Sequence, residues 1–382
     1  MTFEKLGIAV DMIDALKSKN ITEPTQIQRD LIPLIADGQN AVGCSATGTG
    51  KTLAYLLPVL AKIDPEEAAP QAVVLAPTNE LVMQIQREAE ALIAASGRTI
   101  RTMGIAGSAN ISRQIDRLKT KPQLIVASPG RLFELLGKRK VSVFQVKTLV
   151  LDEVDRLLDD QLLPSVEKIL KAVPKQRQMI FVSATITDGT RKKIAKLCPV
   201  TVDKTVESTE VLKQQISHSF IVVDHRRRLE CVRKIYHALG LKRTILFVNR
   251  SYDIPTIVEK LNHHKIKTTG LYREMMAADR KKALADFARG TAHILVATDV
   301  AARGLDIQDV DCIINLYPPE NEKVYLHRAG RTARAGGEGR MILLVTDRDR
   351  ELVGTYARKL PITLTKAIFV NGKWIEKETT RK

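Results

Sequence analysis

Residues 45–52 read Ser-Ala-Thr-Gly-Thr-Gly-Lys-Thr and decide the fold. They follow a short apolar run, Ala41–Cys44, and precede residues 53–57, Leu-Ala-Tyr-Leu-Leu, which we predict to be helical. A strand, a glycine-rich loop and a helix in this order are the context of a phosphate-binding loop. Its glycines let backbone N–H groups face a polyphosphate, while Lys51 would reach the outer phosphates and Thr52 would contact Mg²⁺. Because Ser45 replaces the first Gly of the usual pattern, the segment alone leaves a glycine-rich turn with a solvated lysine as the alternative.

The composition of the whole chain favours a polyanionic partner. The 382 residues suggest two or three domains, and 44% hydrophobic residues suffice for ordinary cores. A formal charge of +17 favours RNA or DNA as the partner, although a charge surplus that only serves solubility is the alternative. No apolar run approaches the ~20 residues of a membrane span, and residues 1–5 do not resemble a secretory signal. The four cysteines form no C-x-x-C pair, so we expect reduced thiols and a cytoplasmic protein without a membrane partner.

Polar clusters follow the predicted strands of the first half of the chain. The apolar run at 72–76 reads as a strand that is buried on both faces, and we predict further strands at 100–106, 124–127, 148–151 and 179–182. They end in small, hydroxyl or acidic residues at 77–81, 107–108, 128–131, 152–155 and 183–185. Because strands alternate with helices, we predict a mostly parallel sheet, and such sheets bind ligands at the carboxyl edge.

A second α/β pattern begins near Ile216 and has predicted strands at 245–248, 293–296, 312–315 and 341–344. It contains no second phosphate loop. We predict an ATP-binding domain at 1–204, a linker at 205–214, a second domain at 215–360 and a short basic extension at 361–382. For this last segment, a packed C-terminal strand followed by frayed residues is the alternative.

Two further groups of residues suggest hydrolysis. Asp152 is suited to hold Mg²⁺ through its water shell and Glu153 to deprotonate an attacking water, although acidic residues are also common at helix starts. Arg328, Arg331 and Arg334 recur at intervals of three, so we expect one helical face to present them to a phosphate. A contact with an RNA backbone is the alternative for this cluster. Since the arginines lie in the second half, hydrolysis would require the two halves to close.

Taken together and in their order along the chain, the motifs of this sequence resemble those of the DEAD-box ATP-dependent RNA helicases. The resemblance covers nearly the whole chain. The short bacterial members, which carry little beyond two domains, are the most similar. The motifs are Phe3 with Pro24–Gln28, 45–52, 77–81, 128–131, 152–155, 183–185, 298–306 and 327–334. The resemblance implies an α/β fold of two tandem RecA-like domains, each a mostly parallel sheet flanked by helices.

The resemblance also implies roles for individual residues. Phe3 and Gln28 would hold adenine, which makes ATP the expected nucleotide, and Gln28 carries an amide that can donate and accept at once. The remaining nucleotide contacts would be Thr47, Gly48, Thr49, Gly50, Lys51, Thr52, Gly304 and Asp306, with Mg²⁺ at Thr52 and Asp152. The catalytic residues would be Lys51, Asp152, Glu153, Arg331 and Arg334. Asp155, Ser183, Thr185 and His327 would couple hydrolysis to closure, and Thr78, Gly107, Arg131, Arg280 and Thr298 would face RNA.

Some positions depart from the family pattern. Val154 replaces Ala, Asn79 replaces Arg, and Ser108 and Ala333 replace Gly. Residues 272–277 read Tyr-Arg-Glu-Met-Met-Ala where His-Gly and a Gln are usual, and Ala277 cannot supply an amide hydrogen bond. The charged groups of 152–155 are kept, so we expect ATPase activity to persist.

The function that we expect is RNA-stimulated ATP hydrolysis coupled to local unwinding of short RNA duplexes. An ATP-dependent RNA clamp with weak hydrolysis is the alternative, whereas Gln28 and the Asp-Glu-x-Asp form disfavour a DNA helicase. The resemblance implies contacts with the RNA backbone and little sequence specificity. It also implies a setting in ribosome assembly or RNA turnover, and we expect a monomer.

Overall fold

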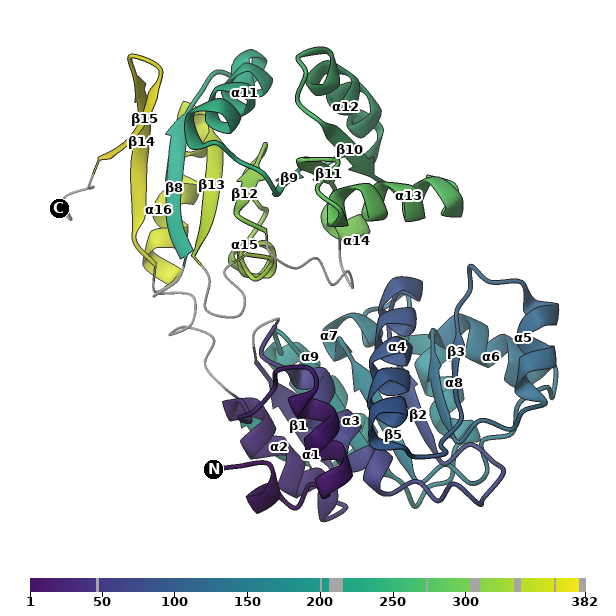
Figure 1. The fold of residues 1–382 in the computed structure, drawn as a ribbon. Helices are drawn as coiled ribbons and strands as arrows, with labels where there is room; N and C mark the ends of the chain where they lie inside the picture. The colour runs from purple at the N-terminus through teal and green to yellow at the C-terminus, as the bar shows by residue number, and fades with distance from the viewer. Residues whose placement is uncertain are drawn as a thin grey trace. The chain divides into compact units, whose positions relative to one another are not determined.

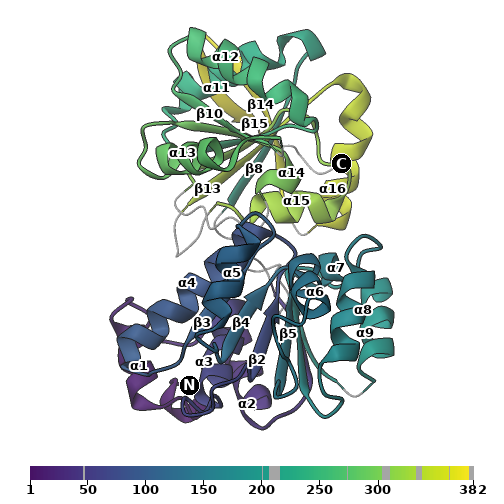
Figure 2. The same ribbon diagram turned by 90° about the vertical axis from the view of Figure 1, so that its right-hand side faces the viewer.

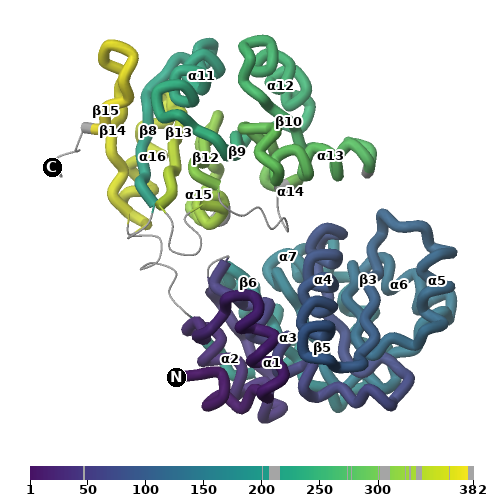
Figure 3. Tube along the Cα trace, viewed as in Figure 1, coloured from purple at the N-terminus to yellow at the C-terminus, as the bar shows by residue number. Residues whose placement is uncertain are grey.

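Two separate sheets organise the protein. The computed structural model describes residues 1–45, 48–199, 201–205, 216–272, 274–302, 310–332, 338–360 and 362–377. The chain divides into two units, Met1–Glu207 and Ser208–Lys382, and each unit carries its own sheet (Figure 1). Figure 3 follows the chain from its N-terminus in the first unit to β14 and β15 in the second. Within the described part of the chain, none of the helices combines the length and the apolar character that a membrane crossing requires.

The sheet of the first unit has seven strands in the order β3-β4-β2-β5-β6-β1-β7, and all neighbouring pairs are parallel. The strands are β1 (Ala41–Cys44), β2 (Ala72–Leu75), β3 (Thr102–Ile105), β4 (Leu124–Ala127), β5 (Thr148–Asp152), β6 (Gln178–Ser183) and β7 (Val202–Thr205). The helices are α1 (Val10–Lys17), α2 (Gln26–Ala36), α3 (Lys51–Ala61), α4 (Asn79–Ser96), α5 (Ile111–Leu118), α6 (Pro129–Gly137), α7 (Val154–Leu157), α8 (Leu163–Ala172) and α9 (Asp188–Leu197).

The apolar strands are continuous because both faces of this sheet are covered. Successive side chains of a strand point to opposite faces, so Val74 packs in one core while Val73 and Leu75 pack in the other. Helices α1 to α4 contribute to the first core and α5 to α9 to the second (Figure 2). The predicted mostly parallel sheet flanked by helices is therefore confirmed.

The second unit repeats this order of strands. Its sheet runs β10-β11-β9-β12-β13-β8-β14-β15, so β8 occupies the place of β1. Among the strands that the structure describes in this unit, β14 and β15 pair antiparallel and the other neighbours pair parallel. The strands are β8 (Ile216–Val222), β9 (Thr244–Phe247), β10 (Thr268–Leu271), β11 (Ile294–Ala297), β12 (Cys312–Asn315), β13 (Gly339–Val345), β14 (Leu364–Val370) and β15 (Lys373–Lys377). The helices are α11 (Arg228–Leu239), α12 (Ile254–His263), α13 (Ala277–Ala288), α14 (Asp299–Ala302), α15 (Glu322–Ala329) and α16 (Arg350–Lys359). Helices α11 and α12 pack on one face and α13 to α16 on the other.

The C-terminal residues belong to this second sheet. Strand β14 pairs parallel with β8, and Asn371 and Gly372 turn the chain back with positive φ into β15. The rings of Phe369 and Trp374 pack edge to face with their centroids 5.5 Å apart. The sequence left two interpretations of residues 361–382, a short basic extension and a packed C-terminal strand. The pairing of β14 with β8 agrees with the packed strand. The predicted linker lies outside the described residues, except for Thr205 at the end of β7.

Candidate nucleotide and RNA site

The phosphate loop joins β1 to α3 with the backbone conformation that its glycines permit. Gly48 and Gly50 have φ of 82° and 84°, a region that residues with a Cβ rarely adopt. A Cβ on Gly50 would also collide with the side-chain amide of Gln28. Gly50 is the N-cap of α3, and Lys51 is its first residue, so the loop ends where backbone N–H groups attract an anion. Thr47 lies outside the described residues.

Ser45 closes the base of this loop. It is fully buried, its carbonyl oxygen accepts a hydrogen bond from Nζ of Lys51, and its hydroxyl pairs with that of Thr49. The departure from the usual first Gly therefore adds a polar contact inside the loop. The separate hydrogen bond from Lys51 to the Ser45 carbonyl holds the ammonium beside the turn in which we predict the phosphates to bind.

Asp152 lies at the carboxyl end of β5, two strands from β1 in the sheet. One oxygen of its carboxylate accepts from the Tyr55 hydroxyl at 2.8 Å and the other from the backbone N–H of Glu153 at 2.8 Å. Burial raises the pKa of Asp152, while the Tyr55 hydrogen bond and the Lys51 charge oppose that rise. Burial, followed by the Asp152 charge, raises the pKa of Tyr55 well above its usual value. The sequence pattern did not single out Tyr55, because it lies within an apolar helical run.

The donor set around Asp152 fits Mg²⁺. Hydroxyl and carboxylate oxygens, here those of Thr52 and Asp152, are the ligands that this ion prefers, with water completing its shell. A buried carboxylate whose pKa is raised also gains from a nearby cation, since the cation favours the ionised form.

Glu153 has a left-handed backbone conformation, with φ of 52° and ψ of 53°. Such a conformation costs a non-glycine residue on the order of 1 kcal/mol and is found mostly where the fold enforces it. Here it turns the chain sharply from the end of β5 into α7. The strained residue is the one to which the sequence assigned activation of water.

Asp155 bridges the ends of β5 and β6. Its two carboxylate oxygens accept from the Ser183 hydroxyl at 2.6 Å and from the Thr185 hydroxyl at 3.3 Å. Ser183 is 1% exposed and its carbonyl accepts from the backbone N–H of Ser45. The three predicted coupling residues of the first unit are thus in one hydrogen-bonded group that reaches the phosphate loop.

The residues assigned to adenine are already engaged within the first unit. Gln28 accepts from the backbone N–H of Thr25 at 2.9 Å and donates to the carbonyl of Gly50 at 3.1 Å, while the Thr25 hydroxyl donates to Thr49 at 2.7 Å. Gln28 therefore fastens the start of α2 to the phosphate loop. Phe3 is 2% exposed in the apolar core, so its ring does not present an open surface.

The residues assigned to RNA in the first unit form one connected loop structure. The Asn79 side chain accepts from the Gly107 N–H at 2.7 Å, and Arg131 donates to the carbonyls of Gly107 and Ala109 at 2.7 and 2.9 Å. Thr78 caps α4 by accepting from the Leu81 N–H at 3.2 Å. Asn79, which replaces the usual Arg, thus fixes the loop through its amide oxygen rather than through a charge.

In the second unit, two residues assigned to RNA meet at Ala301. Arg280 of α13 donates to the carbonyl of Ala301 at 3.1 Å, and the Ala301 N–H donates to the Thr298 hydroxyl at 3.3 Å. These contacts join α13, the end of β11 and α14. Gly304, Asp306 and Arg334 lie outside the described residues, and so do the side chains of His327 and Ala277.

The expectation that three arginines share one exposed face is wrong for Arg328. This residue is 2% exposed, and its Nε and Nη2 pair with Asp299 at 2.8 and 2.7 Å while Nη1 donates to Asn315 at 2.7 Å. Its guanidinium also lies 4.8 Å from the centroid of the Phe247 ring. Spacing alone could not reveal these partners, which come from distant segments. Arg331 is 7% exposed, so it is not a solvated side chain either.

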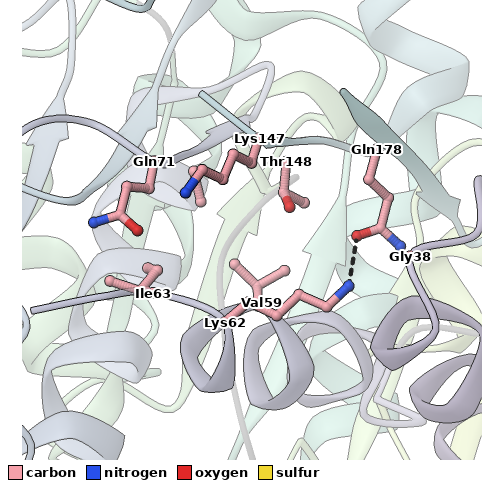
Figure 4. Close-up of a pocket in the computed structure, with 9 residues that line it drawn as sticks. Gly38, Val59, Lys62, Ile63, Gln71, Lys147, Thr148 and Gln178 are labelled. Atoms are coloured by element: carbon pink, nitrogen blue, oxygen red, sulfur yellow. Dashed lines mark hydrogen bonds between the residues drawn. The ribbon is translucent and has the colours of Figure 1, made fainter. Parts of the chain in front are cut away.

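A cavity of about 190 Å³ lies at the opposite, amino edge of the first sheet (Figure 4). Nζ of Lys62 donates to the Gln178 side chain at 3.2 Å, and the Gln71 amide donates to the Asp64 carbonyl at 2.6 Å. Burial lowers the pKa of Lys62. Lys62, Gln71 and Gln178 each have a hydrogen-bond partner within the first unit, so we assign the cavity a structural role.

The chain is similar to known helicases. Residues 25–194 match the family model of the DEAD/DEAH box helicase, and residues 227–336 match the helicase conserved C-terminal domain. The DEAD-box ATP-dependent RNA helicase CshC of Bacillus cereus is 39% identical over 95% of this chain and 92% of its own length. A Bacillus subtilis protein named "Probable ATP-dependent RNA helicase YfmL" is 36% identical over 92% of both chains.

Solved structures show the same architecture. Saccharomyces cerevisiae Dbp5 bound to RNA and ADP BeF3 superposes with a TM-score of 0.84 at 25% identity and covers 96% of this chain and 95% of its own. The chain therefore belongs to the DEAD-box family of ATP-dependent RNA helicases, which are ATP-hydrolysing enzymes. Its two units are RecA-like domains.

Proposed function

We propose that the protein hydrolyses ATP in a reaction that RNA stimulates, and that it uses this cycle to separate or remodel short RNA duplexes. The observation that carries the proposal is the connected edge of the first unit. There, Lys51 lies at the phosphate loop, Tyr55 orients Asp152, and Asp155 binds Ser183. The residues to which we assign phosphate binding and metal binding thus lie at neighbouring strand ends of one sheet, beside a hydrogen-bonded connection between β5 and β6.

We assign the chemical roles as follows. Lys51 and the N–H groups of the loop bind the outer phosphates, and Thr52 and Asp152 hold Mg²⁺, which neutralises phosphate charge when bound. Glu153 orients the attacking water and accepts its proton. The hydrogen-bonded pair of Asp155 and Ser183 supports the end of β6 beside the loop and transmits changes there.

We further assign Arg331 and Arg334 of the second unit to the outer phosphate during turnover. The support is that Arg328 fixes the end of α15 through its buried pair with Asp299, and Arg331 follows two residues after that helix ends at Ala329. Replacing Arg331 with Ala should lower the RNA-stimulated rate by on the order of 10³-fold while ATP binding persists. A variant that hydrolyses ATP at the rate of the parent would contradict the assignment.

RNA is the partner that we propose for the loops of Thr78, Gly107 and Arg131 and for Thr298 and Arg280. The relatives are named RNA helicases, and the Dbp5 structure is titled as bound to RNA. Backbone N–H groups and hydroxyls at these positions suit phosphates and 2′-hydroxyls rather than base edges. Affinity for single-stranded RNA should therefore fall with salt, with a log–log slope of about −0.7 per phosphate contacted.

One experiment tests the enzyme reaction directly. ATP hydrolysis is measured with and without single-stranded RNA for the parent protein, Lys51→Ala and Glu153→Gln. We expect RNA to raise the rate of the parent only, and Glu153→Gln to keep ATP and RNA affinity while losing turnover. Equal and negligible rates in all samples, with RNA still bound in an ATP-dependent manner, would favour the RNA clamp. The altered segment 272–277 is the feature that makes this second function a candidate.

The proposal also includes a setting. We infer that the protein acts as a monomer on RNA in ribosome assembly or RNA turnover. Light scattering at working concentration tests the monomer. Co-sedimentation with ribosomal precursors, compared with Lys51→Ala and with mature subunits as controls, tests the setting.

A further inference from the structure

Two large exposed side chains lie at the carboxyl edge of the second sheet. Tyr252 follows β9 and is 67% exposed, and Met276 follows β10 and is 73% exposed. Strands β9, β11 and β10 are consecutive neighbours and parallel, so the segments after them emerge at the same edge. Neither side chain belongs to the two hydrophobic cores of this unit, so packing does not account for a large side chain at either position.

One contact joins the loops that carry these two residues. The Ser251 hydroxyl donates to the Glu274 carboxylate at 3.4 Å, which joins the segment of Tyr252 to that of Met276. Arg250 donates to the Tyr252 hydroxyl at 2.6 Å, and its guanidinium lies 5.7 Å from the centroid of the ring. The ring is therefore held in place by a charged neighbour while most of its surface stays open.

The same edge carries the residues that we assign to RNA. Thr298 follows β11, the strand between β9 and β10, and Arg280 lies one turn after Met276 in α13. An aromatic ring next to arginine, on an edge that binds a polyanion, is the arrangement on which single-stranded nucleic acids stack their bases. Phosphate binding needs arginines and hydroxyls but no aromatic ring, so the ring of Tyr252 suggests a contact with a base.

We propose that Tyr252, oriented by Arg250 and flanked by Met276, stacks on a base of the bound RNA strand. The second unit then contacts the strand through a base as well as through its backbone. The contact is tolerant of sequence, because every base offers a π face. It rests on the proposed function, since it presumes that RNA occupies this edge.

Abasic RNA separates base stacking from every other role of Tyr252. The RNA concentration that gives half-maximal stimulation of ATP hydrolysis is measured with a single strand and with its fully abasic counterpart of equal length. The proteins are the parent, Tyr252→Ala, Tyr252→Phe, and Phe144→Ala as the matched control. Phe144 is 82% exposed and lies in the first unit, between α6 and β5.

We expect Tyr252→Ala to raise the half-maximal concentration about fivefold on normal RNA, the lower end of measured stacking contacts, and to change nothing on abasic RNA. Phe144→Ala should behave like the parent. Tyr252→Phe keeps the ring and its contact with the Arg250 guanidinium but loses the hydroxyl that accepts from Arg250, so it should lose less than Tyr252→Ala on normal RNA and nothing on abasic RNA. An equal loss on both RNAs would show a backbone contact, and no loss on either would show that the ring faces something other than RNA. Both results would overturn the proposal. A failure of the proposed function is distinguishable, because the parent itself would then show no stimulation by RNA.

A second measurement does not depend on a folded alanine variant. The parent protein is crosslinked by ultraviolet light to RNA that carries 4-thiouridine, in the presence of a non-hydrolysable ATP analogue, and the attached peptide is identified by mass. We expect the peptide that contains Tyr252 to carry the nucleotide. Crosslinks confined to other peptides would contradict the stacking contact.

Discussion

Removal of a single hydroxyl at Tyr55 should weaken the binding of Mg²⁺. Tyr55 is fully buried, and its hydroxyl donates to Asp152 at 2.8 Å. In Tyr55→Phe, one carboxylate oxygen loses its side-chain donor while it stays buried, and a hydrogen bond to a charged group contributes about 1.5–3 kcal/mol. The loss destabilises the ionised form of Asp152 relative to the protonated form, so Mg²⁺ must compete with a more tightly held proton. Because 1.4 kcal/mol corresponds to a factor of ten, the Mg²⁺ concentration for half-maximal hydrolysis should rise by about tenfold at acid pH and less as the pH rises.

The sign of the pH dependence follows from the same contact. Burial raises the pKa of Asp152 and the Tyr55 hydrogen bond opposes that rise, so Tyr55→Phe raises the pKa further. A cation binds the ionised carboxylate, and the loss of activity at acid pH should therefore begin at a higher pH in the variant. The assay is a Mg²⁺ titration of RNA-stimulated hydrolysis at several pH values.

The control is Tyr236→Phe in the second unit, whose hydroxyl pairs with a ring nitrogen of His293 at 2.6 Å. This variant also loses a hydroxyl but should keep the Mg²⁺ dependence of the parent. If Tyr55→Phe has the same Mg²⁺ requirement and the same acid limb as the parent, Asp152 does not bind the metal in the ionised state described here. The reasoning from burial and hydrogen bonding would then be refuted.

Three further outcomes are expected. Arg328→Met should destabilise the second unit by about 3–5 kcal/mol, because it leaves Asp299 without its buried partner, and thermal unfolding should show this while ATP still protects the first unit. Gly50→Ala should weaken ATP binding at least tenfold in a fluorescent-nucleotide titration, because φ of 84° and the Gln28 amide both exclude a Cβ, and parent-like binding would contradict this geometry. The Arg98 hydrogen bond lowers the pKa of Asp11 below its usual 3.8. The ion pair therefore contributes its full stability above about pH 3.8, and this contribution is lost as the pH falls through the lowered pKa of the folded protein. Urea midpoints of Asp11→Asn should accordingly depend less on pH between about 5 and 3 than those of the parent.

Much of the fold could be predicted because its strands are buried on both faces. In an apolar run such as 124–127, the side chains on both faces of the strand are buried, so the run can be recognised without an alternating pattern. The polar residues that follow such a run mark the carboxyl edge of the sheet. The C-terminal strands were harder to assign, since β14 carries lysine and threonine among its apolar residues. The antiparallel pairing of Phe369 with Trp374 depends on a turn that composition alone does not fix.

The position of the candidate residues at one edge of the first sheet could be predicted from the sequence, whereas their hydrogen-bond partners could not. Clusters at strand ends identified Lys51, Asp152 and Ser183, because parallel strands bring their carboxyl ends together. The pairing of Arg328 with Asp299 could not be predicted, since a spacing of three specifies a helix face and not what that face meets. Tyr55 could not be predicted as part of the site either. It lies in an apolar helical run, and such a run gives no indication that one of its hydroxyls donates to a buried carboxylate.

The repeated order of strands explains why one nucleotide site is expected and not two. Strand β8 has the place of β1, and α11 begins at Arg228 as α3 begins at Lys51. The intervening segment, 223–227, contains no glycine, so it cannot adopt the conformation of the phosphate loop. A cavity of about 980 Å³ lies at this edge, but the Arg228 guanidinium packs 4.5 Å from the Tyr317 ring centroid and pairs with Asp349 at 3.3 Å. A carboxylate and a ring thus hold the Arg228 guanidinium at the end of β8, and we expect no nucleotide there, whereas the loop after β1 has positive φ at Gly48 and Gly50.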